Sequence, residues 1–418
     1  MGKIFIGKIL LPPPVRCYLV FLMLLILVPP VAFAGDRPQS EILVLKERLS
    51  QLEQNQGKLN TGSRDKPSVQ VGGYAKLDVV YSSASAGASS IADEFIVNAL
   101  IPSDNDGESD QLKMTARESR LWVKGATADN TSKFYIEGDF FGDKPSSSET
   151  LNNNADFRLR QAYGEIETNE YGRFLLGQAW STFQNLSAFP HATTLGTLPG
   201  QVFTRVSMIR WTSPANHSLQ IALENPESNL KDLNNASVRP DDDRIPDIVI
   251  RYNLQSVSVA SLIRQLRCDM PGTCEDSQSA WAVSVTGRLN PTTRDQLRFQ
   301  IHLGDGIGRY VSGAVFPGGT INANGDIETV EVQALMLSYQ HQWNRRWASA
   351  VIFNTASADN LNAIGGASEE VTTFHVNSTW RPTKPLRLGF EFIRAERETV
   401  AGTDGDLNRL IFSSKYHF

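Results

Sequence analysis

Cationic side chains recur inside short apolar segments of this 418-residue chain. Their residue types and their spacing are suited to binding anions. The cationic residues are Arg120 and Lys124, Arg158 and Arg160, and then Arg205, Arg251, Arg298 and Arg387. Their neighbours at odd offsets are mostly apolar, so in extended segments the cations would project from one face. Guanidinium groups bind carboxylates through paired hydrogen bonds. Such a face therefore predicts recognition of anions.

Carboxylates share the polar face of several of the same segments. They are Asp78, Glu137, Asp139 and Glu224. A wall of ion-paired side chains would impart little selectivity, because each cation would already have a partner. The sequence leaves both interpretations open, an anion-selective wall and an ion-paired one.

The segments that carry these residues alternate with the period of two that is typical of half-buried β-strands. We expect sixteen strands, near residues 69–81, 115–125, 132–141, 156–167, 171–180, 202–212, 217–225, 247–255, 256–266, 279–289, 295–303, 328–342, 345–356, 370–381, 385–397 and 407–418. The alternation slips in 156–167 and 328–342, which predicts bulges or misplaced boundaries there.

Short and long connections alternate between the expected strands. The long polar ones span 82–114, 142–155, 181–201, 226–246, 267–278, 304–327, 357–369 and 398–406. Turns on one rim and long loops on the other are the signature of a bacterial outer-membrane barrel. The fold prediction is an all-β, 16-stranded antiparallel transmembrane β-barrel over residues 68–418, with both termini on the short-turn, periplasmic rim.

The chain ends inside an alternating segment, LNRLIFSSKYHF. Leu410, Phe412, Tyr416 and Phe418 would face lipid, and Arg409, Ser413, Lys415 and His417 would face the lumen. Pairing of this strand with the first one, near Val69, would remove the sheet edges. Tyr416 and Phe418 would lie in the periplasmic aromatic girdle.

The N-terminus predicts export. Lys3, Lys8 and Arg16 precede the apolar run 18–28, and Ala32-Phe33-Ala34 follows it. This order is typical of a secretory signal peptide over residues 1–34. The run is shorter than the roughly 20 residues that a membrane-spanning helix needs, which disfavours an anchor.

Residues 35–67 form a periplasmic coiled-coil segment and linker in our interpretation. Ile42, Leu45, Leu49, Leu52 and Leu59 follow the 3–4 spacing of a short heptad seam. A lone amphipathic helix packed on the body is the alternative. We favour a small parallel coiled coil that oligomerises the chain.

Two cysteines remain after the signal peptide, Cys268 and Cys274 in the polar segment RCDMPGTCED. In an exported protein such a pair most often forms a disulfide. No histidine or cysteine partners for zinc lie nearby, so we expect no such metal site. Calcium bridging by Asp104, Asp106, Glu108 and Asp110, or by Asp241 to Asp243, stays open, although solvated loop charges are the simpler interpretation.

Other functional classes have little support. Loss of three cations and no acids with the signal peptide takes the formal net charge from −5 to −8, which argues against nucleic-acid binding. None of the six histidines lies in a recognisable nucleophile motif, so we expect no catalytic residue and no enzyme. No cofactor is expected. A structural outer-membrane anchor would leave the wide lumen unexplained.

The third long loop, 181–201, contains no Asp, Glu, Lys or Arg. Third loops of sixteen-stranded porins commonly fold inward and narrow the pore. Its polar residues include Thr182, Gln184, Asn185 and His191, which we expect at the constriction. A neutral loop facing an arginine-bearing wall would leave Arg158 and Arg160 uncompensated, and rings of Arg or Lys select anions.

Several motifs resemble the DcaP-like family of trimeric outer-membrane porins. They are GGYAKLDVVY, FYIEGDFFG, FRLRQAYGEI, LLGQAWSTF and the R-x-x-x-x-R-W of residues 205–211. The likeness runs from about residue 40 to 418 and is most specific between 132 and 211. It implies a sixteen-stranded homotrimer that takes up small anionic, especially dicarboxylic, compounds, with Arg158, Arg160 and Arg205 lining the constriction. The likeness also implies that the terminal aromatic strand is recognised by barrel-assembly machinery.

This chain departs from the acidic third loop expected in many relatives, at the positions of Asn185 and His191. That departure favours anion preference over a specific dicarboxylate site. The resulting expectation is an outer-membrane porin for passive diffusion of small hydrophilic, preferentially anionic solutes. The alternative is a general, weakly selective porin.

Overall fold

A computed structural model of the chain describes residues 66–85, 91–103, 109–142, 155–193, 198–214, 216–311, 313–359 and 366–418. The expected signal peptide and coiled-coil segment lie outside these residues, as do Asp104, Asp106 and Glu108. The statements below refer to the described part of the chain.

Antiparallel strands dominate the described residues. They are β1 (Ser68–Ser82), β2 (Gln111–Thr115), β3 (Arg120–Ala126), β4 (Ser132–Asp139), β5 (Arg158–Thr168), β6 (Gly172–Trp180), β7 (Arg205–Thr212), β8 (Leu219–Glu224), β9 (Leu230–Lys231), β10 (Ser237–Val238), β11 (Asp247–Asn253), β12 (Val257–Met270), β13 (Cys274–Leu289), β14 (Asp295–Asp305), β15 (Gly319–Ile321), β16 (Ile327–Thr329), β17 (Glu331–Gln342), β18 (Trp347–Asp359), β19 (Ser368–Trp380), β20 (Leu386–Thr399) and β21 (Asp404–His417). Short 3-10 turns occur at η1 (Ile91–Asp93), η2 (Asn98–Leu100), η4 (Leu186–Ala188) and η5 (Gly308–Tyr310). None of the described residues forms a helix long and apolar enough to cross a membrane.

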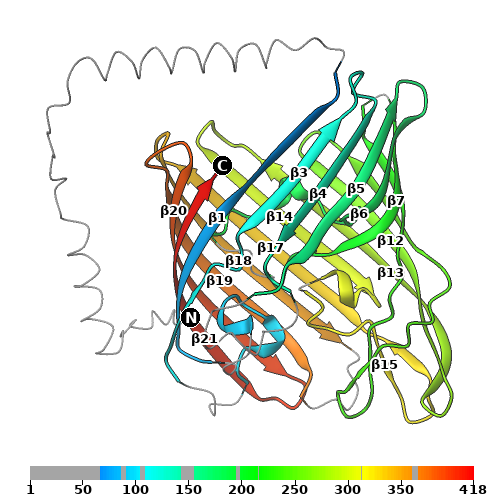
Figure 1. The fold of residues 1–418 in the computed structure, drawn as a ribbon. Helices are drawn as coiled ribbons and strands as arrows, with labels where there is room; N and C mark the ends of the chain where they lie inside the picture. Colours follow the sequence, from blue (N-terminus) through cyan, green and yellow to red (C-terminus); the bar gives the residue numbers. More distant parts are fainter. Residues whose placement is uncertain are drawn as a thin grey trace, which may run out of the picture. The chain divides into compact units, whose positions relative to one another are not determined.

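The large sheet closes into a barrel because its first and last strands pair. β1 pairs with β21 from Tyr74↔His417 to Ser82↔Arg409, and with β3 from Ser68↔Ala126 to Tyr74↔Arg120. β2 pairs with the far half of β1, so β2 and β3 are two pieces of one wall strand, interrupted at residues 116–119. The described wall is therefore a 16-stranded antiparallel barrel, as the alternation predicts (Figure 1). Closure leaves no free edge.

Side chains alternate between the two faces of the wall as expected. On β21, Phe412 and Tyr416 are exposed on the outer face, whereas Arg409 and Ser413 are buried inside. Phe418 exchanges two backbone hydrogen bonds of 3.2 Å with Gly73. The last strand thus pairs with β1 a few residues beyond the expected position near Val69.

The two slips in the alternation have structural causes. A bulge lies between Glu137 and Gly138 of β4, opposite which β5 carries one extra residue, Arg160. The expected strand 328–342 includes a boundary error, because residues 327–329 form the separate strand β16 and β17 begins at Glu331.

Short turns at 127–131, 169–171, 213–218, 254–256, 290–294, 343–346 and 381–385 lie on one rim, together with the start of β1 and the end of β21 (Figure 1). The prediction of long loops at 267–278 and 398–406 is wrong. β12 with β13, and β20 with β21, continue as hairpins to tight turns at 271–273 and 400–403. Polar composition misled the sequence interpretation, because strands beyond a membrane can be polar on both faces.

Four short strands form a second sheet that is not hydrogen-bonded into the wall. Its order is β10-β9-β15-β16, built from the connections after β8 and after β14. The sequence did not predict it, since its strands are only two or three residues long.

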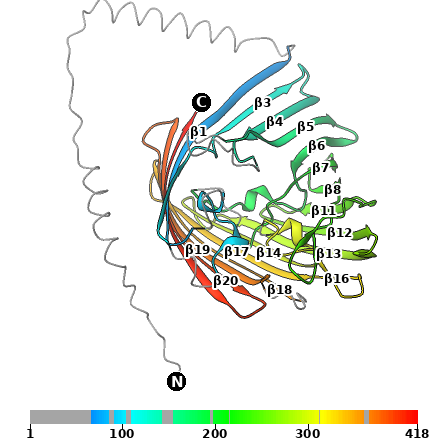
Figure 2. The same cartoon turned by 60° about the horizontal axis from the view of Figure 1, so that its bottom comes forward.

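Three connections, which we call L1 (83–110), L3 (181–204) and L6 (306–330), fold into the barrel with their described parts, 83–85, 91–103, 109–110, 181–193, 198–204, 306–311 and 313–330 (Figure 2). Ile96 and Ile101 of L1 pack on Ile393 and Ile411 of the inner wall. Tyr310 and Phe316 of L6 pack beside inner-wall alanines that include Ala260, Ala282 and Ala356. The inner wall near the long-loop rim is therefore partly apolar, and its small residues leave room for the loops.

Candidate constriction site

L3 follows the inner wall of the barrel, and its first residues are bonded to β8. Glu224 accepts hydrogen bonds from Ser181 Oγ at 2.8 Å and from the Thr182 amide at 2.6 Å. Arg251 of β11 donates to the Gln184 carbonyl. These bonds explain why Thr182 and Gln184 are fully buried. Both residues hold the loop to the wall and do not face the channel.

The middle of L3 is held by β13 and β14. Asn185 Nδ2 donates to Thr286 Oγ1 at 2.9 Å, and its Oδ1 caps η4 by accepting from the Ser187 amide. Gln300 Nε2 donates to the Ala188 carbonyl at 3.0 Å. The neutral amide residues of the loop are thus matched to amide and hydroxyl groups of the wall.

The far end of L3 reaches β19 and β20. Asn377 Nδ2 donates to the His191 carbonyl at 2.7 Å, and the Thr193 amide donates to Glu391 Oε2 at 2.7 Å. Arg387 Nη2 lies 2.9 Å from His191 Nδ1. Burial and the positive charge of Arg387 lower the pKa of His191 to about 3, so this imidazole is neutral.

Two glycines permit the close approach of L3 to the wall. A Cβ on Gly200 would lie 1.9 Å from the Leu335 carbonyl oxygen of β17. A Cβ on Gly389 would lie 2.5 Å from Thr193 Cγ2. At Gly200 the neighbour is backbone, so any side chain there would push the loop away from β17.

A cavity of about 190 Å³ lies between L3 and the neighbouring part of the wall. The wall side is formed by Tyr74, Glu118, Arg120 and Lys415. The L3 side is formed by Phe189, Pro190, Ala192, Thr193, Leu198 and Gln201. The polar L3 residues expected at the constriction are therefore mostly wall contacts, and the surface of L3 that faces this cavity is largely apolar.

Arg158 and Arg160 face inward but are ion-paired, contrary to the expectation that they are uncompensated. Arg158 Nε lies 3.0 Å from Asp139 Oδ1. Arg160 lies 2.8 Å from Glu137 Oε1 and 2.6 Å from Asp139 Oδ2, and only 2% of its side chain is exposed. The neutral loop is irrelevant to these two residues, because their partners come from the neighbouring strand β4.

Arg205 is held differently. Its guanidinium lies 4.8 Å from the Trp180 ring centroid and 5.8 Å from that of Phe203. Arg160 lies against the same Trp180 ring, at 5.9 Å. Among the described residues, no carboxylate forms an ion pair with Arg205, and its Nη1 is buried without a hydrogen-bond partner.

The remaining predicted cations are spread over the wall. Arg120 lies 3.6 Å from Glu137 and over the Tyr74 ring. Lys124 is exposed near the short-turn rim, 5.0 Å from its neighbour Trp122. Arg298, also toward that rim, donates to Gln340 and Gln296. Lys124 and Arg298 are therefore not brought to the L3 cavity.

Glu118 is the site residue that sequence reasoning missed. It lies in the break between β2 and β3, where it contacts Lys76 and lies 3.7 Å from Lys415. Lys415 Nζ lies 4.2 Å from the Tyr74 ring centroid, and Lys76 lies 2.9 Å from Asp78. The charged run Arg117-Glu118-Ser119-Arg120 inside an apolar segment was the available signal.

Tyr310 connects L6 with the first residues of L3. Its hydroxyl lies 3.1 Å from Glu224 Oε2 and 2.8 Å from Asp247 Oδ2. Asp247 is paired with Arg264 at 3.3 Å. Burial and the two carboxylates raise the pKa of Tyr310 well above its usual range, so the hydroxyl remains a donor. L3 and L6 are thus joined through one buried polar network.

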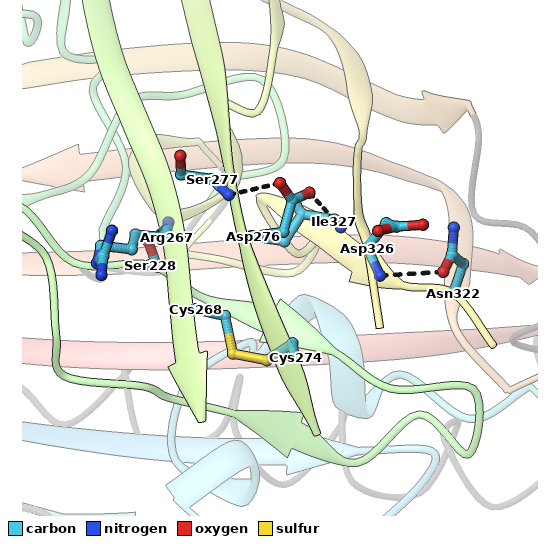
Figure 3. Close-up of a disulfide and its surroundings, with 9 residues drawn as sticks. All are labelled: Ser228, Arg267, Cys268, Cys274, Asp276, Ser277, Asn322, Asp326 and Ile327. Carbon is cyan, nitrogen blue, oxygen red and sulfur yellow. Dashed lines mark hydrogen bonds between the residues drawn. A yellow bond between two sulfur atoms is a disulfide. The ribbon is translucent and has the colours of Figure 1, made fainter. Parts of the chain in front are cut away.

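The expected disulfide joins Cys268 and Cys274 at the tip of the β12–β13 hairpin (Figure 3). Both cysteines are buried beside Leu230, Ile321 and Ile327 of the small sheet. Asp276 next to the bridge accepts a hydrogen bond of 2.9 Å from the Ile327 amide. The bridge therefore lies against the small sheet and supports it.

No group of three or more His, Cys, Asp or Glu side chains among the described residues is arranged to hold a metal ion. Asp243, one of the acidic loop residues considered for calcium, instead accepts hydrogen bonds from the Ser228 amide at 2.8 Å and from its hydroxyl at 2.6 Å.

The closed sixteen-stranded wall with an inward-folded third loop defines a barrel of the porin type. A family model described as the DcaP outer membrane protein matches residues 44–418, so the chain belongs to this family of outer-membrane proteins. The sequence resemblance is therefore confirmed, and the location is the outer membrane.

Solved structures show the same fold. The outer membrane channel DcaP of Acinetobacter baumannii aligns with a TM-score of 0.70 and 23% identity, over 85% of this chain and 99% of that one. The anion-selective porin from Comamonas acidovorans aligns with a TM-score of 0.53 and 13% identity, over 84% and 100%. The trimer form of OmpT from Vibrio cholerae aligns with a TM-score of 0.51 and 11% identity, over 85% and 100%. No curated protein matches the chain.

Proposed function

We propose that this chain is a passive outer-membrane channel that prefers small anionic solutes, dicarboxylates among them. The observation that carries the proposal is Arg205, whose guanidinium lies beside Arg160 on a shared tryptophan and has no carboxylate partner among the described residues. A half-buried cation without a partner gains a charge-assisted hydrogen bond when a carboxylate passes.

The charges near the cavity support the same direction. The cluster of charged side chains on β1, β3, β4, β5, β7 and β21, and in the break between β2 and β3, contains the cations Lys76, Arg120, Arg158, Arg160, Arg205 and Lys415 and the carboxylates Asp78, Glu118, Glu137 and Asp139, an excess of two positive charges within this set. L3 contributes no charged residue, and His191 is neutral. Because the cations lie on several strands, a solute with two carboxylates can contact two cationic side chains at once.

The second candidate is a weakly selective general porin, and the ion pairs of Arg158 and Arg160 favour it. In those pairs, the carboxylates of Glu137 and Asp139 neutralise two guanidinium groups that would otherwise bind anions. The two candidates differ in whether the cation excess at Arg205 and Lys415 acts on a passing solute.

We also propose an oligomeric state and an orientation in the membrane. The heptad seam of residues 42–59 and the trimeric OmpT neighbour support a homotrimer, with both termini in the periplasm. Deletion of residues 40–60 should weaken the trimer without unfolding the barrel. An unchanged trimer on native gels and in heat-dissociation assays would show that the segment is dispensable.

Blocking of ion current tests the function. Succinate added to single trimers in a planar bilayer should interrupt the chloride current transiently, and more often than the neutral diamide of succinate. Block that is equal for the acid and the diamide, or absent for both, would contradict an anion site at the constriction.

A further inference from the structure

L3 turns its polar groups to the wall and leaves an apolar surface on the channel side. Leu186 lies on η4, whose neighbours Asn185 and Ala188 are bonded to the inner wall, yet 52% of its own side chain is exposed. Phe189, Pro190 and Ala192 are only partly buried and line the 190 Å³ cavity. We call these four residues the apolar strip, of which Phe189, Pro190 and Ala192 line the cavity and Leu186 lies beside them on η4. Exposed apolar surface that is grouped inside a channel marks a contact surface for solutes.

The wall that lines the same cavity carries more cations than carboxylates. It presents Arg120 and Lys415, together with the single carboxylate of Glu118. Phe189 also packs on Trp180, with ring centroids 5.5 Å apart, and Trp180 carries the guanidinium of Arg205 on its ring. A solute in the constriction therefore meets an apolar surface on one side and cations on the other.

We propose that the constriction favours small anions with an apolar body over equally charged anions whose body is hydroxylated. The proposal rests on the proposed anion preference and names the solute class within it. The anionic group lies toward Arg205, Arg120 and Lys415, while the apolar body displaces water from the apolar strip. Sites of this kind, mostly apolar with a few placed polar groups, are typical of small-molecule recognition.

The size of the cavity limits the solute. Its volume of about 190 Å³ is below the roughly 300–1,000 Å³ of sites for drug-sized ligands. The apolar contact is also one-sided, since the wall across the cavity is charged. Binding is therefore weak enough for release, as conduction requires.

Two six-carbon monoanions, hexanoate and gluconate, are the probes. Each replaces chloride on one side of a planar bilayer, and zero-current potentials give the permeability ratio of hexanoate to gluconate. In Leu186→Gln and in Ala192→Ser this ratio should fall by about three-fold, the effect expected for loss of part of one apolar contact. Both residues are exposed or half-buried, so the barrel folds in both variants.

Leu233→Gln is the matched control, because Leu233 is 44% exposed in the connection between β9 and β10, outside the constriction. It should keep the wild-type ratio. An unchanged ratio in both strip variants, or an equal fall in the control, would overturn the proposal.

The result is separable from that of the proposed function. Chloride-over-potassium selectivity should be the same in the wild type and in Leu186→Gln, since the change removes no charge. A channel that is anion-selective but treats hexanoate and gluconate alike in wild type and strip variants contradicts only the inference. A cation-selective wild type contradicts the proposed function itself.

Discussion

Arg160 donates a hydrogen bond of 2.6 Å to Asp139 across the bulge between β4 and β5. The same carboxylate accepts from Arg158, at 3.0 Å. One aspartate thus compensates two arginines that would otherwise face a passing anion.

Removal of that carboxylate should increase anion preference. In Asp139→Asn the two guanidinium groups keep a neutral acceptor but gain net charge, so the chloride-to-potassium permeability ratio should rise by about two-fold or more. Glu167→Gln is the control, because Glu167 pairs with Arg173 and Lys133 near the short-turn rim. A ratio that is unchanged or lower in Asp139→Asn would show that this ion pair lies outside the permeation path.

Gly200 should control the width of the channel. A methyl group at this position meets the Leu335 carbonyl at 1.9 Å, so Gly200→Ala must move L3 away from β17 and toward the opposite wall. We expect a lower single-trimer conductance at unchanged barrel stability. Gly366→Ala, where the nearest atom is 3.6 Å from the added carbon, should conduct like the wild type. Equal conductance in both variants would contradict the observed contact of L3 with the wall.

Reduction of the disulfide should act locally. The closed loop between Cys268 and Cys274 is short, so the entropic stabilisation is about 2 kcal/mol. Because the bridge packs on the small sheet, hydrogen exchange should accelerate in residues 319–329 and not in the barrel strands. The double variant Cys268→Ser with Cys274→Ser should behave like the reduced protein. Protection that is insensitive to reductant would contradict this role.

The anion preference of the channel should not change with protonation of His191 near neutral pH. Its pKa is lowered from 6.5 to about 3, so the folded protein binds this proton only in strong acid. The unfolded chain binds more protons between these two values, and the attachment of L3 through His191 therefore weakens as pH falls below 6.5, not above it. Anion preference should stay constant as pH falls through 6.5. A rise in anion preference centred near pH 6.5 that His191→Gln abolishes would contradict the buried, neutral imidazole.

The sequence predicted the wall well, because the period of two survives wherever one face meets lipid. The pair Phe412 and Ser413 illustrates this, one exposed and the other buried. The hairpin extensions were missed, since both faces of a strand beyond the membrane can be polar.

The site was predicted less well than the wall, because its partners are fixed by register. Asp139 and Arg158 face each other only through the pairing of β4 with β5, which alternation alone does not specify. Likewise, no periodicity says that Thr182 of L3 is buried against Glu224, or that Leu186 is left exposed. Loop conformation depends on tertiary contacts that a single sequence does not show.

The zero-current potential in a potassium chloride gradient tests the central claim most directly. We expect the zero-current potential of the wild-type trimer to have the sign that indicates higher permeability to chloride than to potassium. In Arg205→Met, which keeps an apolar side chain against Trp180 and Phe203, the potential should shift toward zero. Arg394→Gln removes a charge from the outer face and should leave it unchanged. A potassium-selective wild type, or an unshifted potential in Arg205→Met, would contradict the account.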